Sequence, residues 1–226
     1  MISDQSSFAF PEDSARFLAD LKANNDKVWF AENKKRYQDV IQAPAKEFVS
    51  HVEELLRERS GLVHQSRIFR IYRDLRFSKD KTPYNTHLHI SFSPLERCQE
   101  GPVWFFGLEV NRLVMGCGQF AFAKDVLTAY RNAVLDGRGE QLQSIIEGLK
   151  AVGGYIHEPD LKRIPRGFDA EHQRASLLLH KGLSGWINMD VNDASLPGLV
   201  SRLGKKMNDL QPLYNWLGNL TDDQLV

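Results

Sequence analysis

Cationic side chains crowd into one short segment of this chain, from Arg67 to Lys81. The segment carries six positive and two negative charges, although the whole chain has a formal net charge of zero. Like charges about 6 Å apart repel by roughly 3 kcal/mol per pair at an effective dielectric near 20. Such a cluster needs counter-charges, which must come from carboxylates of the protein or from an anionic ligand. Guanidinium groups suit a ligand because they bind phosphate and carboxylate in bidentate fashion.

We therefore expect a small phosphate- or carboxylate-bearing ligand to bind at this segment. The predicted anion-binding residues are Arg70, Arg73, Arg76, Lys79, Lys81 and Tyr84, and the predicted orienting carboxylates are Asp74 and Asp80. The lysines would add charge, and the tyrosine hydroxyl would donate a hydrogen bond.

Two alternatives stay open. In the first, the segment is an internal ion-pair network, and the protein is a non-enzymatic module that acts through a protein interface. In the second, its cations and interleaved aromatic side chains bind single-stranded nucleic acid weakly. The two aspartates in the segment and the neutral chain as a whole weigh against nucleic acid.

A β-strand is the element that best positions this segment. Its basic residues recur every three positions, a spacing that spirals around a helix instead of following one face. The Ile, Phe and Tyr content between residues 67 and 77 favours an extended conformation. Alternation would place Arg70, Asp74 and Arg76 on a polar face. It would leave Arg73 on an apolar face, where an arginine needs a hydrogen-bonded partner.

Apolar periodicity predicts helices on both sides of a central β region. Helices are expected before residue 61, with Asp26 as an N-cap, and later at 124–136, 140–152, 171–181 and 195–220, the last interrupted near Pro212. Residues 87–93 alternate as a half-buried strand, 103–118 form a hairpin, and 186–191 form another strand. We therefore predict a single α+β domain over residues 1–226, with a central, mostly antiparallel sheet and the N- and C-terminal helices packed on it.

The other candidate reactive groups give weaker signals. His87 and His89 would share one strand face, but no further ligand follows at metal-binding spacing, so we predict no metal site and no cofactor. Cys117 lies between two glycines and is predicted to be a small core residue. No GxSxG, Walker A or GxGxxG motif occurs. The sequence assigns no reaction type, so whether the protein is an enzyme stays open.

The sequence lacks the features typical of membrane proteins and of disulfide-rich secreted proteins. No stretch approaches the length of a membrane span, and the first residues lack the pattern of a signal peptide. Two cysteines, Cys98 and Cys117, are too few for a disulfide framework. We expect a cytoplasmic protein with no membrane partner, and the sequence gives no oligomeric state.

Two stretches of the sequence resemble a known family. RIYRDLRFSKDKTPY and, near the N-terminus, FLADLKANNDKVWF are similar to the bacterial family called domain of unknown function 2461. The signature of that family, R-x-x-R-D-x-R-F followed by D-K and a tyrosine, falls here on Arg70, Arg73, Asp74, Arg76, Phe77, Asp80, Lys81 and Tyr84. A KRIPRGF stretch at residues 162–168 extends the similarity over most of the chain. The resemblance implies a cytoplasmic single-domain protein of about this size and supplies no activity.

Overall fold

The computed structural model describes residues 7–95 and 101–222, and Cys98 lies outside these ranges. The chain forms two compact units. Unit 1 comprises Met1–Leu95, Phe105–Met115 and Asn188–Lys205, and unit 2 comprises Glu96–Trp104, Gly116–Ile187 and Lys206–Val226. The single domain over residues 1–226 stays a prediction.

A six-stranded antiparallel sheet has the strand order β1-β2-β3-β4-β6-β5. Its strands are β1 (His64–Ile68), β2 (His87–Pro94), β3 (Val103–Glu109), β4 (Leu113–Gln119), β5 (Tyr155–Ile156) and β6 (Leu183–Met189). The predicted alternation in β2 is confirmed, because Leu88, Ile90 and Phe92 are buried while His87 and His89 are partly exposed. The predicted α+β class, with a central antiparallel sheet, is also confirmed.

Helices precede and follow the strands along the chain. They are α1 (Asp13–Ala23), α2 (Lys27–Glu32), α3 (Lys34–Tyr37), α4 (Ala43–Ser60), α5 (Lys124–Leu135), α6 (Gly137–Ala151) and α7 (Leu199–Asp222), with a π-helical turn at Gln38–Gln42. The predicted N-cap of α2 is confirmed, since the Asp26 carboxylate accepts hydrogen bonds from the backbone N–H groups of Val28 and Trp29. Pro212 lies inside α7 and does not end it.

The helix predicted over residues 171–181 is wrong, because only a short 3₁₀ helix forms there, at Ala175–Leu179. Tertiary contacts decide this segment. The buried Arg174 side chain donates to the carbonyl oxygens of Val134, Leu135 and Asp136, which end α5. Fixing that side chain at the end of another helix holds the backbone in a turn, so helical propensity does not decide the conformation.

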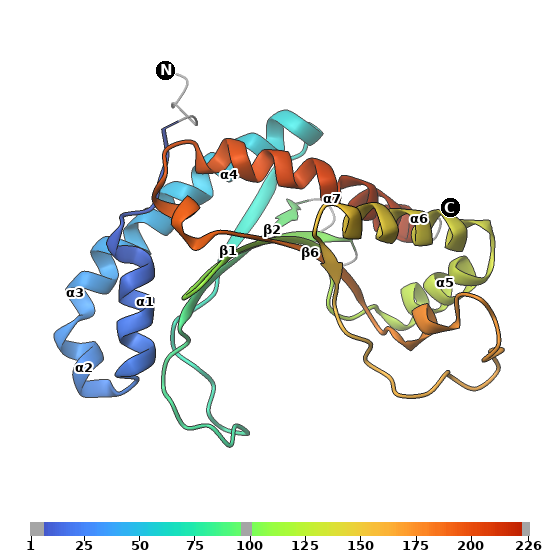
Figure 1. Cartoon of the computed structure of the whole chain (residues 1–226), viewed down its shortest axis with the longest axis horizontal. Helices are drawn as coiled ribbons and strands as arrows, with labels where there is room; N and C mark the ends of the chain where they lie inside the picture. The colour runs from blue at the N-terminus through green and yellow to red at the C-terminus, as the bar shows by residue number, and fades with distance from the viewer. Residues whose placement is uncertain (1–6, 96–100, 223–226) are drawn as a thin grey trace. The chain divides into compact units, whose positions relative to one another are not determined.

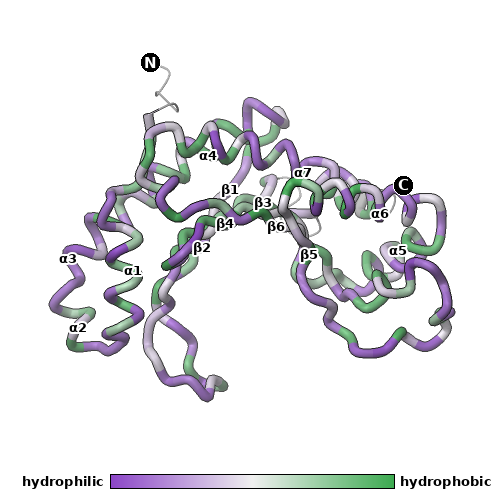
Figure 2. The backbone as a smooth tube through the Cα atoms, in the orientation of Figure 1, coloured by the Kyte–Doolittle hydropathy of each residue, from purple (hydrophilic) through white to green (hydrophobic). Residues whose placement is uncertain are grey.

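The strand predicted over residues 67–77 is wrong beyond Ile68. Residues 69–86 form an irregular two-legged loop, called the arginine loop below, which extends from the ends of β1 and β2 on the side of the N-terminal helices α1 and α2 (Figure 1). Hydrophilic residues dominate its outer part (Figure 2). The predicted apolar face does not form either, since Ile71 is buried but Phe77 is 96% exposed.

A register mismatch explains why the ladder stops. Ile68 pairs with Ile90, and the next bridge joins Tyr72 to Tyr84. Between these two pairs the chain advances four positions on the first leg, from 68 to 72, but six on the returning leg, from 84 to 90. The two extra residues on the returning leg break the regular pairing. Pro83 adds to this, because it has no backbone N–H to donate.

Contacts with the N-terminal helices hold the inner part of the arginine loop. The Asn25 side chain pairs with the backbone of Tyr84, donating to its carbonyl oxygen at 2.9 Å and accepting from its N–H at 3.0 Å. The ring of Phe30, in α2, stacks on the buried Tyr84 ring with 4.1 Å between centroids. Asn25 thus supplies the backbone pairing that a neighbouring strand would supply in a regular sheet.

Replacing Asn25 with alanine removes both hydrogen bonds and leaves two backbone groups of Tyr84 without partners. We expect Asn25→Ala to lower the free energy of unfolding by about 1–2 kcal/mol, measured by urea denaturation. Asn24→Ala is the matched control, because the exposed Asn24 side chain makes one hydrogen bond, to the Asp20 carbonyl oxygen. Equal losses in the two variants would contradict the clamping role of Asn25.

Candidate anion-binding site

A cleft of about 360 Å³ opens where β1 and β2 give way to the arginine loop. Both legs of the loop and both strands contribute side chains to it. The lining residues are Arg67, Phe69, Arg70, Tyr72, Arg73, Asp74, Asn85, His87 and His89. The cleft lies within unit 1.

Two of the three lining arginines form no ion pair with a described carboxylate, although Asp74 interacts electrostatically with Arg70. Among the described residues, no carboxylate forms an ion pair or hydrogen bond with Arg67 or Arg70, and the structure leaves both side chains exposed. The Arg67 guanidinium lies over the Phe69 ring, 4.9 Å from its centroid. Stacking uses the face of the guanidinium, so its N–H edge stays available to an anion.

Arg73 is neutralised by a carboxylate of the protein, that of Asp80. Its guanidinium donates to the Asp80 carboxylate at 2.6 Å, to the Thr82 carbonyl oxygen at 3.0 Å and to the Thr82 hydroxyl. The Thr82 N–H and the Arg73 guanidinium lower the pKa of Asp80 because both bind its ionised form. This clamp closes the outer end of the loop and fixes the position of Arg73 at the cleft.

Arg76 is also paired with a carboxylate of the loop. It forms a 2.6 Å ion pair with Asp74 and is itself largely exposed. Its hydrogen bonds lower the pKa of the Asp74 carboxyl. The guanidinium therefore neutralises a carboxylate that lines the cleft, although Arg76 itself is not part of the lining.

The other predicted site residues lie outside the cleft lining. Lys79 is exposed, and Lys81 donates to the Leu75 carbonyl oxygen. Tyr84 is 5% exposed and packs against Phe30, so it contributes to the support of the loop. The structure thus brings Arg70, Arg73 and Asp74 together in the cleft lining. Asp80 lies outside the lining and forms an ion pair with Arg73.

Two histidines that the sequence analysis assigned to a polar strand face also line the cleft. The rings of His87 and His89 stack with 3.7 Å between centroids. Burial and the neighbouring His89 ring lower the pKa of His87 to about 4. Burial also lowers the pKa of His89, although Glu109 opposes this from 3.5 Å. Both rings are therefore neutral near pH 7 and offer N–H donors.

Sequence reasoning missed Arg67, Asn85 and both histidines as residues of one site. The missing information was strand pairing, because β1 runs antiparallel to β2 with Arg67 opposite Ser91. That register places Arg67 on the strand face that carries His89, two residues along. The alternation of β2 was visible in the sequence, but its partner strand was not.

The buried Cys117 offers no reactive thiol. It is 0% exposed, burial raises the pKa of its thiol, and its sulfur lies 3.6 Å from the Leu210 carbonyl oxygen. Trp186 lies against Gly116 so closely that any side chain there would overlap its ring. The predicted packing role of these small residues fits this arrangement.

The fold and the cleft together define an α+β protein with an arginine-rich candidate site. The family described as "Conserved hypothetical protein (DUF2461)" matches residues 13–216, and the chain belongs to that family. No curated protein matches the chain. Within residues 7–95 and 101–222, no helix combines the length and apolar character needed to cross a membrane.

The lowered pKa of His87 makes folding depend on pH. Between about pH 4 and 6.5 the unfolded chain binds more protons at this ring than the folded protein does. The free energy of unfolding should therefore fall as the pH drops through this window, by about 1–2 kcal/mol once solvent screening is allowed for. NMR titration of the His87 ring should give a midpoint near pH 4, and a midpoint near 6.5 would contradict the burial argument.

Proposed function

We propose that this protein binds a small phosphate- or carboxylate-bearing ligand in the cleft between β1, β2 and the arginine loop. One observation carries the proposal. Carboxylates of the loop form ion pairs with Arg73 and Arg76, yet among the described residues none forms an ion pair with Arg67 or Arg70 at the same cleft. Asp74 attracts Arg70 electrostatically, but its carboxylate is hydrogen-bonded to Arg76. An internal ion-pair network alone would not require two guanidinium groups at one cleft without ion-pair partners.

The electrostatics of the cleft favour an anion. Three guanidinium groups face one carboxylate there, and that carboxylate is already paired with Arg76. The neutral histidines can donate hydrogen bonds without adding to the repulsion among the arginines. An oxyanion would relieve that repulsion and accept several charge-assisted hydrogen bonds at once.

The size of the cleft favours a small ligand. A volume of about 360 Å³ lies at the lower end of the range typical of small-molecule sites. Phe69 and Tyr72 line it beside the arginines, so the non-ionic part of the ligand would have aromatic surface to contact. No reaction type is assigned, because no pair of lining groups has the geometry of a nucleophile and its base.

A protein-interaction role is the second candidate. It is favoured by Phe77, which is 96% exposed near the end of the arginine loop, with the Arg76 guanidinium 6.0 Å from its ring centroid. An exposed aromatic beside a cation is a common anchor at interfaces. This role does not need the cleft, so the two candidates respond to different substitutions.

Anion binding should depend on the unanswered arginines. We expect phosphate, sulfate or a sugar phosphate to raise the melting temperature, and calorimetry to show one site per chain. Arg67→Ala and Arg70→Ala should each weaken binding at least about tenfold, the cost of losing charge-assisted hydrogen bonds. Arg70→Lys should recover only part of the loss, because lysine cannot form a bidentate pair.

Two controls separate site binding from general charge effects. Arg163→Ala removes an exposed arginine in unit 2, and Lys79→Ala removes an exposed lysine of the same loop that does not line the cleft. Both should leave affinity within about twofold at physiological salt. Absence of a melting shift with every anion, or equal losses in the controls, would overturn the proposal and leave Phe77→Ala as the variant to examine for partner binding.

The carboxylate in the cleft should oppose the ligand. Asp74→Asn removes a negative charge from the lining and releases Arg76 from its ion pair. We expect anion affinity to rise about two- to fivefold, and the gain to shrink as salt is added. If Asp74 instead orients the arginines for binding, as the sequence analysis suggested, affinity will fall, and calorimetry at two salt concentrations distinguishes these outcomes.

A further inference from the structure

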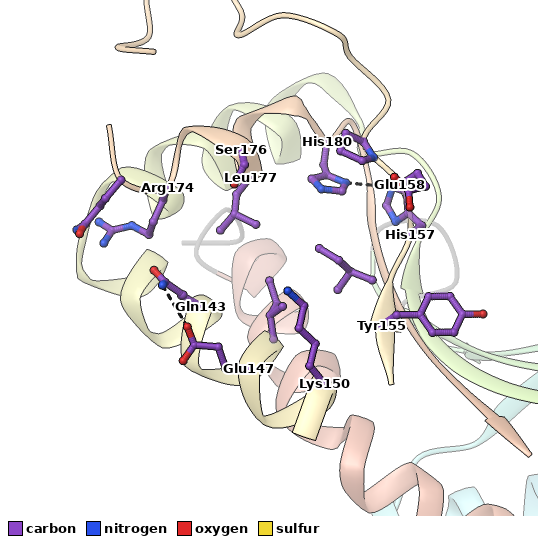
Figure 3. A pocket seen from close by; sticks show the side chains of 14 residues that line it. Gln143, Glu147, Lys150, Tyr155, His157, Glu158, Arg174, Ser176, Leu177 and His180 are labelled. Atoms are coloured by element: carbon purple, nitrogen blue, oxygen red, sulfur yellow. Dashed lines mark hydrogen bonds between the residues drawn. The ribbon is translucent and has the colours of Figure 1, made fainter. Parts of the chain in front are cut away.

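A second cluster of reactive side chains lies in unit 2, independent of the anion cleft. Within the described residues, His157, Asp160 and His180 each bring one ligand atom to a common point, with all three atoms inside 4.8 Å of one another. Two of these side chains are largely withdrawn from solvent: His180 is 2% exposed, and the His157 side chain is 22% exposed. Figure 3 shows His157 and His180 pointing toward one another at one end of a cavity.

Two of the three separations within the cluster are close to those of a tetrahedral metal site, and the third is no more than 4.8 Å. The distance from His157 Nε2 to His180 Nδ1 is 3.4 Å, and from His157 Nε2 to Asp160 Oδ2 it is 3.6 Å. Zinc binds histidine nitrogen and carboxylate oxygen at about 2.0–2.2 Å, so neighbouring ligand atoms in a tetrahedron lie about 3.3–3.5 Å apart. His157 Nε2 therefore has a nitrogen of His180 and an oxygen of Asp160 at separations that suit a shared ion.

The surrounding residues hold two of the three ligand side chains in place. The backbone N–H of Lys181 donates to Asp160 Oδ2 at 2.6 Å, which fixes the carboxylate. The Ser184 backbone N–H donates to His157 Nδ1 at 3.1 Å, and the Ser184 hydroxyl oxygen lies 3.2 Å from the same nitrogen. A metal at Nε2 requires the proton of this ring on Nδ1, where it would donate to the Ser184 oxygen; the Ser184 N–H would then lose its acceptor.

The cavity beside the cluster leaves room for a further ligand. It has a volume of about 450 Å³ and is lined by His157 and His180 together with polar side chains that include Lys150, Tyr155 and Glu158. A three-ligand site that opens onto a cavity is typical of metals that also bind water or a substrate. A structural site would close the fourth position with another protein ligand.

We propose that His157, Asp160 and His180 bind a divalent transition-metal ion of the zinc type, with its fourth position open to this cavity. Two imidazoles and one carboxylate suit such an ion better than magnesium or calcium, which prefer an all-oxygen environment. The competing explanation is a metal-free cluster, in which the protonated Nε2 of His157 donates to His180 or Asp160.

Zinc titration tests the proposal. Untagged protein, stripped with a chelator and dialysed, should take up one Zn²⁺ per chain by calorimetry. Co²⁺ should give the visible absorption of a four-coordinate site. Asp160→Asn and His180→Gln should each weaken zinc binding at least about tenfold. Glu158→Gln, in the same cavity wall but outside the ligand set, should change it less than about twofold.

NMR of the unmodified protein tests the same site without relying on variants, which could fail to fold. Zinc should shift the side-chain ¹⁵N resonances of His157 and His180, and it should leave those of His87 and His89 unchanged. Failure to bind zinc, uptake that survives both ligand substitutions, or shifts confined to His87 and His89 would each overturn the proposal.

Discussion

The repulsion among guanidinium groups is the constraint on which the arginine loop depends. The repulsion is relieved unevenly: Asp80 and Asp74 form ion pairs with Arg73 and Arg76 of the loop. Arg70 of the loop and Arg67 of β1 form no ion pair with a described carboxylate, and Arg70 shares only the electrostatic attraction of Asp74. The paired arginines hold the backbone of the outer loop through hydrogen bonds to Asp80, Thr82 and Asp74. The same pairing concentrates the unsatisfied positive charge on the inner side, where the cleft opens. The same cluster of charges therefore holds the loop in its conformation and makes the candidate cleft positive.

The arginine loop departs from a regular sheet. The two extra residues between Tyr84 and Ile90 interrupt the ladder, although backbone hydrogen bonds still join Arg73 to Pro83 and Asn85 to Ile71. Asn25 and Phe30 then support the returning leg from outside the sheet. The loss of ladder hydrogen bonds is offset by these contacts and by the clamp around Arg73.

The sequence predicted the parts of this fold that rest on local periodicity. The Asp26 cap, the alternation of β2 and the hairpin of β3 and β4 each follow from patterns within a dozen residues. The α+β class followed from the order of such patterns along the chain. Strand pairing did not follow, because nothing near residue 67 shows that it lies opposite residue 91. The candidate cleft was consequently predicted from charge alone and without the two histidines.

Two of the errors in the predicted secondary structure fall on candidate sites, whereas the interruption wrongly predicted near Pro212 does not. The predicted strand at residues 67–77 contains the arginine loop, and the predicted helix at 171–181 contains Arg174 and His180. The strand ends where the registers of the two legs stop matching, and the helix is replaced where Arg174 binds the end of α5. His157 and His180 meet although 22 residues separate them in the sequence, so no spacing rule could have paired them. A disagreement between local pattern and actual backbone is expected near functional groups, and each candidate site includes residues from such a segment.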